Sequence, residues 1–377
     1  MKTEQLQWLQ QTGWSSPESL MNGQAALVFA FGGIDVIGNP EVYAELHKRY
    51  SNANIVMAST AGEIHGNSVS DGSISVTACN FDYTATEIMS LKVDDFADSY
   101  ACGEAIAADL LKDDLKHILV FSDGTSVNGD ELVKGINQGL PKQVIVTGGL
   151  AGDAGRFNGT RVGVNAVPVG NNIVAIGFYG DRFHVAHGSQ GGWDAFGPIR
   201  KVTKSNGNVL MELDGENALA VYKKYLGTRA SELPGAALLF PLCIHGDDGS
   251  RLVRTILTID EQTGSMNFAG NIPIDANVQF MMANFDRLVD GAAGAAEQSV
   301  AMTRKAKPDL VMMVSCVGRK IVLGQRIDEE VESVCNIFGE GPAYTGFYSN
   351  GEISPLLNSV GCSLHNQTMT ITTYKEE

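Results

Sequence analysis

Short hydrophobic runs alternate with amphipathic stretches along the first 150 residues, and this alternation predicts a sheet with helices packed against it. The apolar runs at 24–31 and 54–58 predict two buried strands. Between them, Asn39 and Pro40 open a helix, because asparagine caps helix N-termini and proline fits the first turn. The core-facing side of that helix carries Val42, Tyr43, Leu46 and Tyr50. The same reasoning predicts strands at 73–79, 85–93, 117–121 and 143–147, and helices at 99–111 and 129–138.

Beyond residue 156 the pattern changes to consecutive strands joined by short turns. Gly170-Asn171 and Gly180-Asp181 are typical hairpin turns. They separate strands predicted at 161–167, 173–179 and 183–186. A glycine-rich loop at 188–197 follows, and a helix is predicted to run through Leu226. Later segments predict strands at 236–242, 252–259, 309–316 and 367–373, with helices at 284–306 and 326–338.

These patterns predict a mixed α/β fold of two related domains, without fixing the order of the strands. A chain of 377 residues suits two domains rather than one. We expect an N-terminal helical extension at 1–22, a first domain at 23–215 and a second at 216–377.

Composition narrows the class of protein. The formal net charge of −16 disfavours binding to nucleic acid or to an anionic membrane. The polar first residues lack the apolar core of a signal peptide, and no apolar run reaches the ~18 residues of a membrane span, so we expect a cytoplasmic protein. The six cysteines show no metal-binding or disulfide spacing, which favours buried free thiols.

Sequence motifs of common enzymes are absent. The chain has no nucleophile-elbow motif, no Walker A motif and no zinc-protease motif. The stretch Gly148–Gly152 lacks the spacing of a dinucleotide-binding loop. We therefore expect that the protein is not an enzyme, and the alternative left open is a hydrolase with Cys316 as nucleophile and His365 as base.

A short box occurs twice, once in each half of the chain. Ser59–Ile64 and Tyr348–Ile353 both follow an apolar run, and both contain Gly-Glu-Ile. Glycine permits a tight turn, from which the acid projects at the end of a strand. Glu63 and Glu352 either accept an amine of a ligand or hold the turn by accepting backbone N–H bonds. Ser349, in the second box, is a further candidate ligand contact.

Polar side chains also gather near two strand ends in the second half. Arg319 follows Gly318 directly after a buried strand, where a guanidinium suits an anionic group. His365 and Asn366 lie between the flexible Gly361 and the closing strand. Such residues either bond to one another or face a ligand, and both interpretations stay open.

The order and spacing of these motifs resemble the FIST family of prokaryotic sensory proteins, which have an N-terminal and a C-terminal FIST domain. The second half carries the more specific motifs, with 315–320, 323–326, 346–353 and 364–370 in the family's order. In the first half the resemblance rests on 59–64, 147–153 and 213–215. The resemblance implies a module that binds small ligands such as amino acids.

The single-module length is similar to a stand-alone subset of the family that senses nitric oxide through haem. This similarity implies a non-covalently bound haem b, with His365 as first candidate axial ligand, His187 as second, and Arg319 pairing a propionate. It also implies signalling in trans to a histidine kinase or a cyclic-di-GMP enzyme. The alternative is a sensor of amino acids or another metabolite without haem. The oligomeric state is left open.

Overall fold

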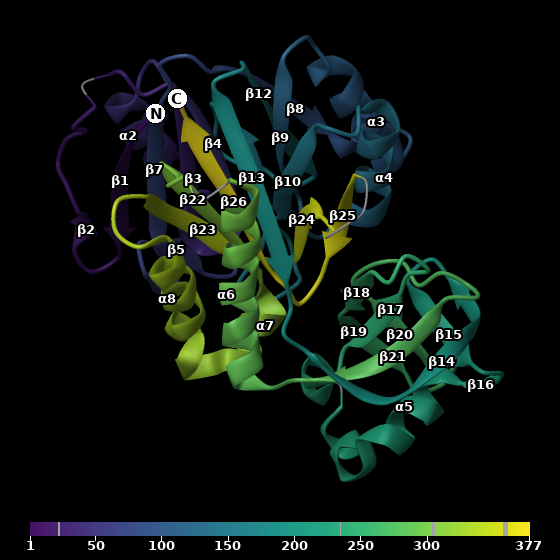
Figure 1. Ribbon diagram of the computed structural model, residues 1–377. Helices are drawn as coiled ribbons and strands as arrows, with labels where there is room; N and C mark the ends of the chain where they lie inside the picture. Colours follow the sequence, from purple (N-terminus) through teal and green to yellow (C-terminus); the bar gives the residue numbers. More distant parts are fainter. Residues whose placement is uncertain (22, 234, 304–305, 357–360) are drawn as a thin grey trace.

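The computed structural model describes residues 1–377 except 22, 234, 304–305 and 357–360. It forms two bodies joined by two crossings of the chain (Figure 1). The main body contains residues 1–190 and 285–377. The small body contains residues 194–282. Among the described residues, no helix has both the length and the apolar character needed to span a membrane.

The first sheet of the main body is built around a parallel pair of strands. All seven residues of β3 are buried, as expected for a strand covered on both faces. β4 runs parallel to β3, and β7 runs antiparallel on its other side. The strand order is β11 (Val162–Val164), β4 (Asn54–Thr60), β3 (Leu27–Gly33), β7 (Ile74–Asn80), β1 (Lys2–Leu9) and β2 (Gly13–Trp14).

The second sheet repeats this arrangement. β10 runs parallel to β9, and β12 lies antiparallel on the far side of β9. The strand order is β25 (Cys362–His365), β24 (Gly351–Pro355), β10 (Ile145–Leu150), β9 (Leu115–Ser122), β12 (Asn172–Tyr179) and β8 (Ala85–Lys92).

The third sheet repeats it again. β23 runs parallel to β22, and β26 lies antiparallel on the other side of β22. The strand order is β13 (Phe183–Gln190), β26 (Met369–Glu376), β22 (Leu310–Cys316), β23 (Ala343–Ser349), β5 (Glu63–His65) and β6 (Ser68–Ser70).

Helices connect the two parallel strands of each sheet and cover the outside of the main body (Figure 1). The connections contain α2 in the first sheet, α4 in the second, and α7 with α8 in the third. Helix α3 packs against α4, and α6 packs against β13 and α8. The helices are α1 (Ile34–Ile37), α2 (Pro40–Arg49), α3 (Ser99–Leu110), α4 (Gly129–Gly139), α6 (Phe285–Met302), α7 (Val317–Leu323) and α8 (Ile327–Phe338).

Each of these three units passes a strand to a neighbouring sheet. The strand after β4, β5, pairs with β23 of the third sheet. The strand after β23, β24, pairs with β10 of the second sheet. The strand after β10, β11, pairs with β4 of the first sheet. The main body is therefore a cyclic arrangement of three units, where the sequence suggested two related halves.

The core of the main body lies where the three sheets meet. Phe31 of β3, Phe121 of β9 and Phe347 of β23 are fully buried there. The Phe31 ring centroid lies 4.7 Å from that of Phe347 and 5.5 Å from that of Phe121. The Phe121 and Phe347 centroids are 5.9 Å apart. One phenylalanine from each sheet thus joins the three units.

The small body is one curved sheet with a helix packed against it. Its two terminal strands, β18 and β19, are separated in the chain only by Thr255, so the sheet bends back toward its start. Helix α5 (Ala218–Leu226) contributes Leu219 and Tyr222 to the core of this body. The order is β18 (Arg251–Arg254), β17 (Leu242–His245), β21 (Asn277–Met282), β14 (Asp194–Asn206), β15 (Val209–Leu213), β20 (Ser265–Phe268) and β19 (Ile256–Asp260), with β16 (Glu216–Asn217) on β15.

The mixed α/β fold is confirmed, and so are the helices predicted near residues 40, 99, 129, 285 and 327. The helical extension predicted at the N-terminus is wrong, because Lys2–Leu9 forms β1 and pairs with β7. Within β1, Glu4 and Leu6 are buried at alternate positions, a period that suits a strand with one face toward the core. The strand predicted at 236–242 is instead a 3₁₀ turn, Gly235–Leu239, followed by β17.

The predicted boundary at 215/216 falls inside the small body. Leu213 of β15 pairs there with Glu216 of β16, so the chain makes one hairpin at this point. The chain after Met282 returns to the main body and supplies β22, β23 and β26 of the third sheet. In space, the second predicted domain is thus divided between the two bodies.

Candidate ligand pocket between the two bodies

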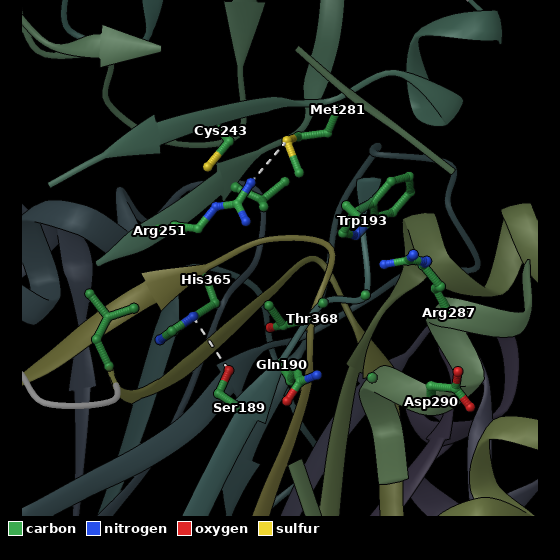
Figure 2. A pocket seen from close by; sticks show the side chains of 15 residues that line it. Ser189, Gln190, Trp193, Cys243, Arg251, Met281, Arg287, Asp290, His365 and Thr368 are labelled. Atoms are coloured by element: carbon green, nitrogen blue, oxygen red, sulfur yellow. Dashed lines mark hydrogen bonds between the residues drawn. The ribbon is translucent and has the colours of Figure 1, made fainter. Parts of the chain in front are cut away.

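A pocket of about 560 Å³ lies between the two bodies (Figure 2). The main body contributes the end of β13, the start of α6 and the turn between β25 and β26. The small body contributes β17, β18 and β21. The pocket is lined by residues of both bodies: Ser189, Gln190, Gly191, Gly192, Trp193, Cys243, Arg251, Val253, Met281, Arg287, Asp290, Gly291, Leu356, His365 and Thr368.

The charged groups of the pocket come from both bodies. Arg251 extends from β18 of the small body, and Arg287 and Asp290 lie one helical turn apart on α6 of the main body (Figure 2). Arg287 pairs with Asp194 at 3.0 Å. Within the described part of the chain, neither Arg251 nor Asp290 has an opposite charge within 4 Å. The side-chain contacts of Arg251 are to sulfur: its Nη2 lies 3.8 Å from the sulfur of Met281, and its guanidinium also interacts with the Cys243 thiol.

The apolar part of the lining is formed by Trp193, Met281, Val253 and the buried Cys243. The indole Nε1 of Trp193 donates to the carbonyl of Gln367 at 2.8 Å, which fixes the ring at the pocket wall. The pocket therefore combines an apolar wall with a few polar groups that converge from different elements, as small-molecule sites usually do.

His365 is the one predicted site residue that lines this pocket. Its Nε2 donates to the carbonyl of Ser354 at 2.9 Å, since a carbonyl can only accept, and its Nδ1 lies 3.4 Å from the hydroxyl of Ser189. Burial lowers the pKa of His365 to about 4, and the nearby Arg254 charge acts in the same direction. At neutral pH the ring is therefore neutral, with Nδ1 as its acceptor.

The two Gly-Glu-Ile turns do not share the pocket. Glu63 borders a separate hollow of about 320 Å³, near Asp71, Arg156 and Lys320. Its carboxylate accepts from the backbone N–H of Ser73 at 2.9 Å and from the Ser73 hydroxyl at 2.8 Å. These contacts agree with the interpretation in which Glu63 holds its turn by accepting backbone N–H bonds.

Glu352 is buried and holds its own turn in the same way. It accepts from the hydroxyl of Ser349 at 2.9 Å and from the hydroxyl of Thr368 at 2.8 Å. Burial raises the pKa of Glu352 to about 8. Ser349 and Glu352 thus bond to each other beneath the surface, while Thr368 links them to the pocket wall.

Arg319 does not present its charge to a ligand. Its side chain is fully buried and pairs with Glu330, with Nη2–Oε2 at 2.7 Å and Nε–Oε2 at 3.0 Å. The remaining guanidinium N–H groups donate to carbonyls of Leu288, Gly191 and Gln367. The prediction that Arg319 pairs an anionic group of a ligand is therefore corrected: its partners are internal and use all of its donors.

Asn366 is fully buried, and its Nδ2 donates to the carbonyl of His365 at 2.9 Å. Its Oδ1 and both polar atoms of the Gln367 side chain have no protein hydrogen-bond partner in the described chain. Gln367 also has a φ of +63°, in the region that favours glycine. The 365–368 turn therefore contains buried polar groups and backbone strain directly behind the pocket.

His187 and His184 point to opposite faces of β13, as predicted, and only His187 is largely buried. Burial lowers the pKa of His187 to about 4. In the described part of the chain, no cluster of three or more His, Cys, Asp or Glu side chains is arranged to hold a metal ion.

The pocket residues do not fit a haem in this arrangement. Axial ligation through the unprotonated Nδ1 of His365 would displace the Ser189 hydroxyl, which lies 3.4 Å away, while Nε2 could keep its bond to the Ser354 carbonyl. Arg319, the expected partner of a propionate, is buried and saturated. The lining around His365 also contains three charged side chains, where a porphyrin face requires apolar contact.

The alternative catalytic pair is not supported by the environment of Cys316. This thiol is fully buried, and its pKa is raised by burial and by the Glu352 charge. A nucleophilic cysteine requires the thiolate, which such surroundings disfavour. All six cysteines are free thiols, as predicted, and only Cys335 is partly exposed.

Sequence reasoning missed Arg251, Asp290 and Trp193. Trp193 lies in the glycine-rich stretch that was recognised, and a large aromatic ring among glycines was a usable signal. Arg251 and Asp290 gave no signal, because their relationship depends on how the small body packs against α6.

Two family models match the chain, and they meet near residue 217, inside the small body. No curated protein matches the chain. The FIST N domain model matches residues 26–216, which is half of the chain, and the FIST C domain model matches residues 218–355. The FIST C match ends at Pro355, ten residues before His365, and includes residues 218–282 of the small body together with β22 and β23 of the third sheet. The chain belongs to the FIST family, whose domains are small-ligand sensory domains of signal transduction.

Proposed function

We propose that this protein senses a small zwitterionic metabolite, an amino acid or a close relative, in the pocket between the two bodies. The observation that carries the proposal is a pair of exposed charges on its walls that have no opposite charge within 4 Å among the residues that the structure describes. Arg251 suits a carboxylate and Asp290 suits an ammonium group, and they belong to different bodies.

The charge balance of the whole chain strengthens the role of Arg251. Arg251 is exposed and solvated, and although the protein has a net charge of −16, the described part of the chain places no acidic group within 4 Å of its guanidinium. A ligand carboxylate would provide that partner by a charge-assisted hydrogen bond. Trp193 and Met281 would cover the apolar part of the same ligand.

The remaining polar groups add recognition at the floor of the pocket. The Nδ1 of His365 accepts a hydrogen bond, and the Thr368 hydroxyl lies on the same wall. Because the pKa of His365 is lowered, this acceptor persists at neutral pH. A neutral acceptor and two opposite charges in the same lining favour a polar ligand over a porphyrin.

We further propose that the signal passes to a separate protein, a histidine kinase or a cyclic-di-GMP enzyme. Signalling requires the ligand to bind two arrangements of the protein unequally. A ligand that contacts Arg251 and Asp290 at once connects the bodies, so it stabilises the arrangement in which they are close.

A thermal-shift screen of the twenty amino acids tests the proposed ligand class. A ligand that binds only the folded protein raises the melting temperature, and at about 100 times Kd it adds about 2.7 kcal/mol. We expect a shift with a subset of amino acids in the wild type and none with the same amino acids in Arg251→Met. Arg200→Met, whose arginine pairs with Asp214 inside the small body, is the matched control. A screen without any shift in the wild type would overturn the proposed ligand class.

A further inference from the structure

The two bodies touch in two regions, on opposite sides of the pocket. Beside the chain crossings, Trp193, Cys243 and Met281 pack with Leu288, Val322 and Leu323 in one apolar cluster. On the far side the contact is polar and centres on Arg254 of β18. The pocket lies between an apolar contact and a polar one.

Arg254 reaches from the small body into the main body. Its Nη2 lies 2.7 Å from Oδ1 of Asp130 in the first turn of α4, and its Nη1 donates to the carbonyl of Leu364 on β25 at 2.8 Å. Asn271 of the small body supports the contact by donating its N–H to Asp130 at 2.5 Å and its Nδ2 to Glu131 at 2.9 Å. Arg254 is only 2% exposed and Asp130 9%, so water screens this pair weakly.

The same contact positions two walls of the pocket. Arg251 lies three residues before Arg254 on β18, and His365 directly follows Leu364 on β25. When Arg254 holds Asp130 and the Leu364 carbonyl, β18 and β25 are kept beside each other. If the contact breaks, Arg251 and His365 are free to separate.

The chain crosses between the bodies at two points that suit a hinge. The first contains Gly191 and Gly192. Gly192 has a φ of +84°, and a Cβ there would lie 1.9 Å from the carbonyl oxygen of Arg287, so only glycine fits. The second is Ala283–Asn284, where β21 ends and Asn284 caps α6. Two short crossings on one side allow the other side to open.

We propose that Arg254 is a latch: its contact with Asp130 and Leu364 holds the small body against the main body over the pocket, and its release opens the pocket about the two crossings. This inference rests on the proposed function in that the latch controls access to the proposed ligand site. A buried ion pair suits the role, because breaking it is costly while its intact form adds little to overall stability. A ligand bound to Arg251 and Asp290 adds a second connection and stabilises the latched state.

Alkylation of Cys243 by N-ethylmaleimide, followed by mass spectrometry of peptides, tests the latch without any ligand. Cys243 lines the pocket and is fully buried in the latched state, so its reaction rate reports opening. We expect Arg254→Met and the isosteric Asp130→Asn to increase this rate about tenfold or more. The rates at the partly exposed Cys335 and the core thiol Cys79 should stay unchanged. Arg200→Met is the control for loss of an arginine within the small body.

An unchanged rate at Cys243 in both latch variants would overturn the proposal. An equal increase at Cys79 and Cys243 would also overturn it, because the pair would then stabilise the whole fold and not the closure. If Arg254→Met does not fold, Asp130→Asn gives the answer alone. Since no ligand is present, a failure here is separate from a failure of the proposed ligand class.

Discussion

Glu63 and Glu352 make the same set of contacts in two different sheets. Each accepts from a hydroxyl three residues earlier, Thr60 or Ser349, and from both the N–H and the hydroxyl of one further residue, Ser73 or Thr368. Each therefore fixes the turn through which its unit passes a strand to the next sheet. In the third unit, Asp153 follows Ala151-Gly152 and accepts instead from the backbone N–H groups of 157–159.

The two buried glutamates predict a pH dependence of stability. Burial raises the pKa of Glu352 to about 8 and that of Glu63 to about 7, from an ordinary value of 4.5. Between pH 5 and 7 the folded state keeps protons on these two glutamates that the unfolded state loses. Their contribution to the free energy of unfolding is therefore complete below about pH 4.5 and declines as the pH rises. The folding equilibrium constant should fall by up to about tenfold per pH unit for each group.

Urea unfolding of the wild type and of Glu352→Gln at pH 5, 6 and 7 measures this effect. Buried histidines such as His365 have lowered pKa values, so below about pH 6.5 they make the free energy of unfolding rise with pH. Because both proteins share this effect, the quantity to compare is the difference between their free energies of unfolding. As the pH rises, the free energy of unfolding of Glu352→Gln should increase relative to that of the wild type. A constant difference between Glu352→Gln and the wild type across this pH range would contradict the prediction.

The Arg319–Glu330 pair predicts a large cost for removing either partner. Glu330 also accepts from the hydroxyl of Tyr348 at 2.6 Å, and all three side chains are fully buried. Arg319→Met should reduce the free energy of unfolding by about 3–5 kcal/mol, because it leaves a buried carboxylate without its charge partner. Urea denaturation measures the loss.

An exposed ion pair provides the control for this variant. Arg156 pairs with Asp35, and both side chains are more than half exposed. Arg156→Met should therefore cost no more than about 1 kcal/mol. Equal losses in Arg156→Met and Arg319→Met would show that burial does not determine the value of the Arg319 pair.

The backbone of β23 at Gly346 leaves no room for a side chain. A Cβ at this position would lie 1.9 Å from the carbonyl oxygen of Met313 on the neighbouring strand, and the backbone has a φ of +157°. Gly346→Ala should separate the two parallel strands and destabilise the protein by more than about 2 kcal/mol. Gly235→Ala, with no atom within 4 Å of the added Cβ, should remain within about 1 kcal/mol of the wild type in thermal denaturation. Similar melting temperatures for the two variants would contradict the prediction.

The fold could be predicted from the sequence as far as local patterns determine it. The apolar period located the main helices, and the cap Asn39 marked the start of α2. The exchange of β5, β11 and β24 between sheets could not be predicted, because it depends on contacts far apart in the chain. The N-terminal strand was missed because Lys2–Leu9 is polar at most positions and becomes ordered through the open edge of β7.

The candidate site was predictable only in part, for a similar reason. His365 was found because polar residues cluster beside a strand end, and it does line the pocket. Arg319 was misassigned, because a sequence does not reveal that Glu330 lies one helix later and faces back toward it. Arg251 became a candidate only when the small body was seen to place it opposite α6.

The charged lining around His365 and the buried ion pair of Arg319 predict that the purified protein is colourless. After expression with ample haem supply, we expect no Soret band at a stoichiometric level and no spectral change with nitric oxide. His365→Ala should have the same spectrum as the wild type. A Soret band in the wild type that disappears in His365→Ala would show that His365 binds iron and would restore the haem interpretation.

The most direct test of the central claim is a calorimetric titration of the best amino acid from the thermal-shift screen. The titration would compare the wild type with Arg251→Met, Asp290→Asn and the control Arg200→Met. Loss of a charge-assisted contact costs about 1.5–3 kcal/mol, so Kd should rise about tenfold or more in each pocket variant and stay unchanged in the control. Equal affinity in the wild type and both pocket variants would place the ligand elsewhere and contradict the account.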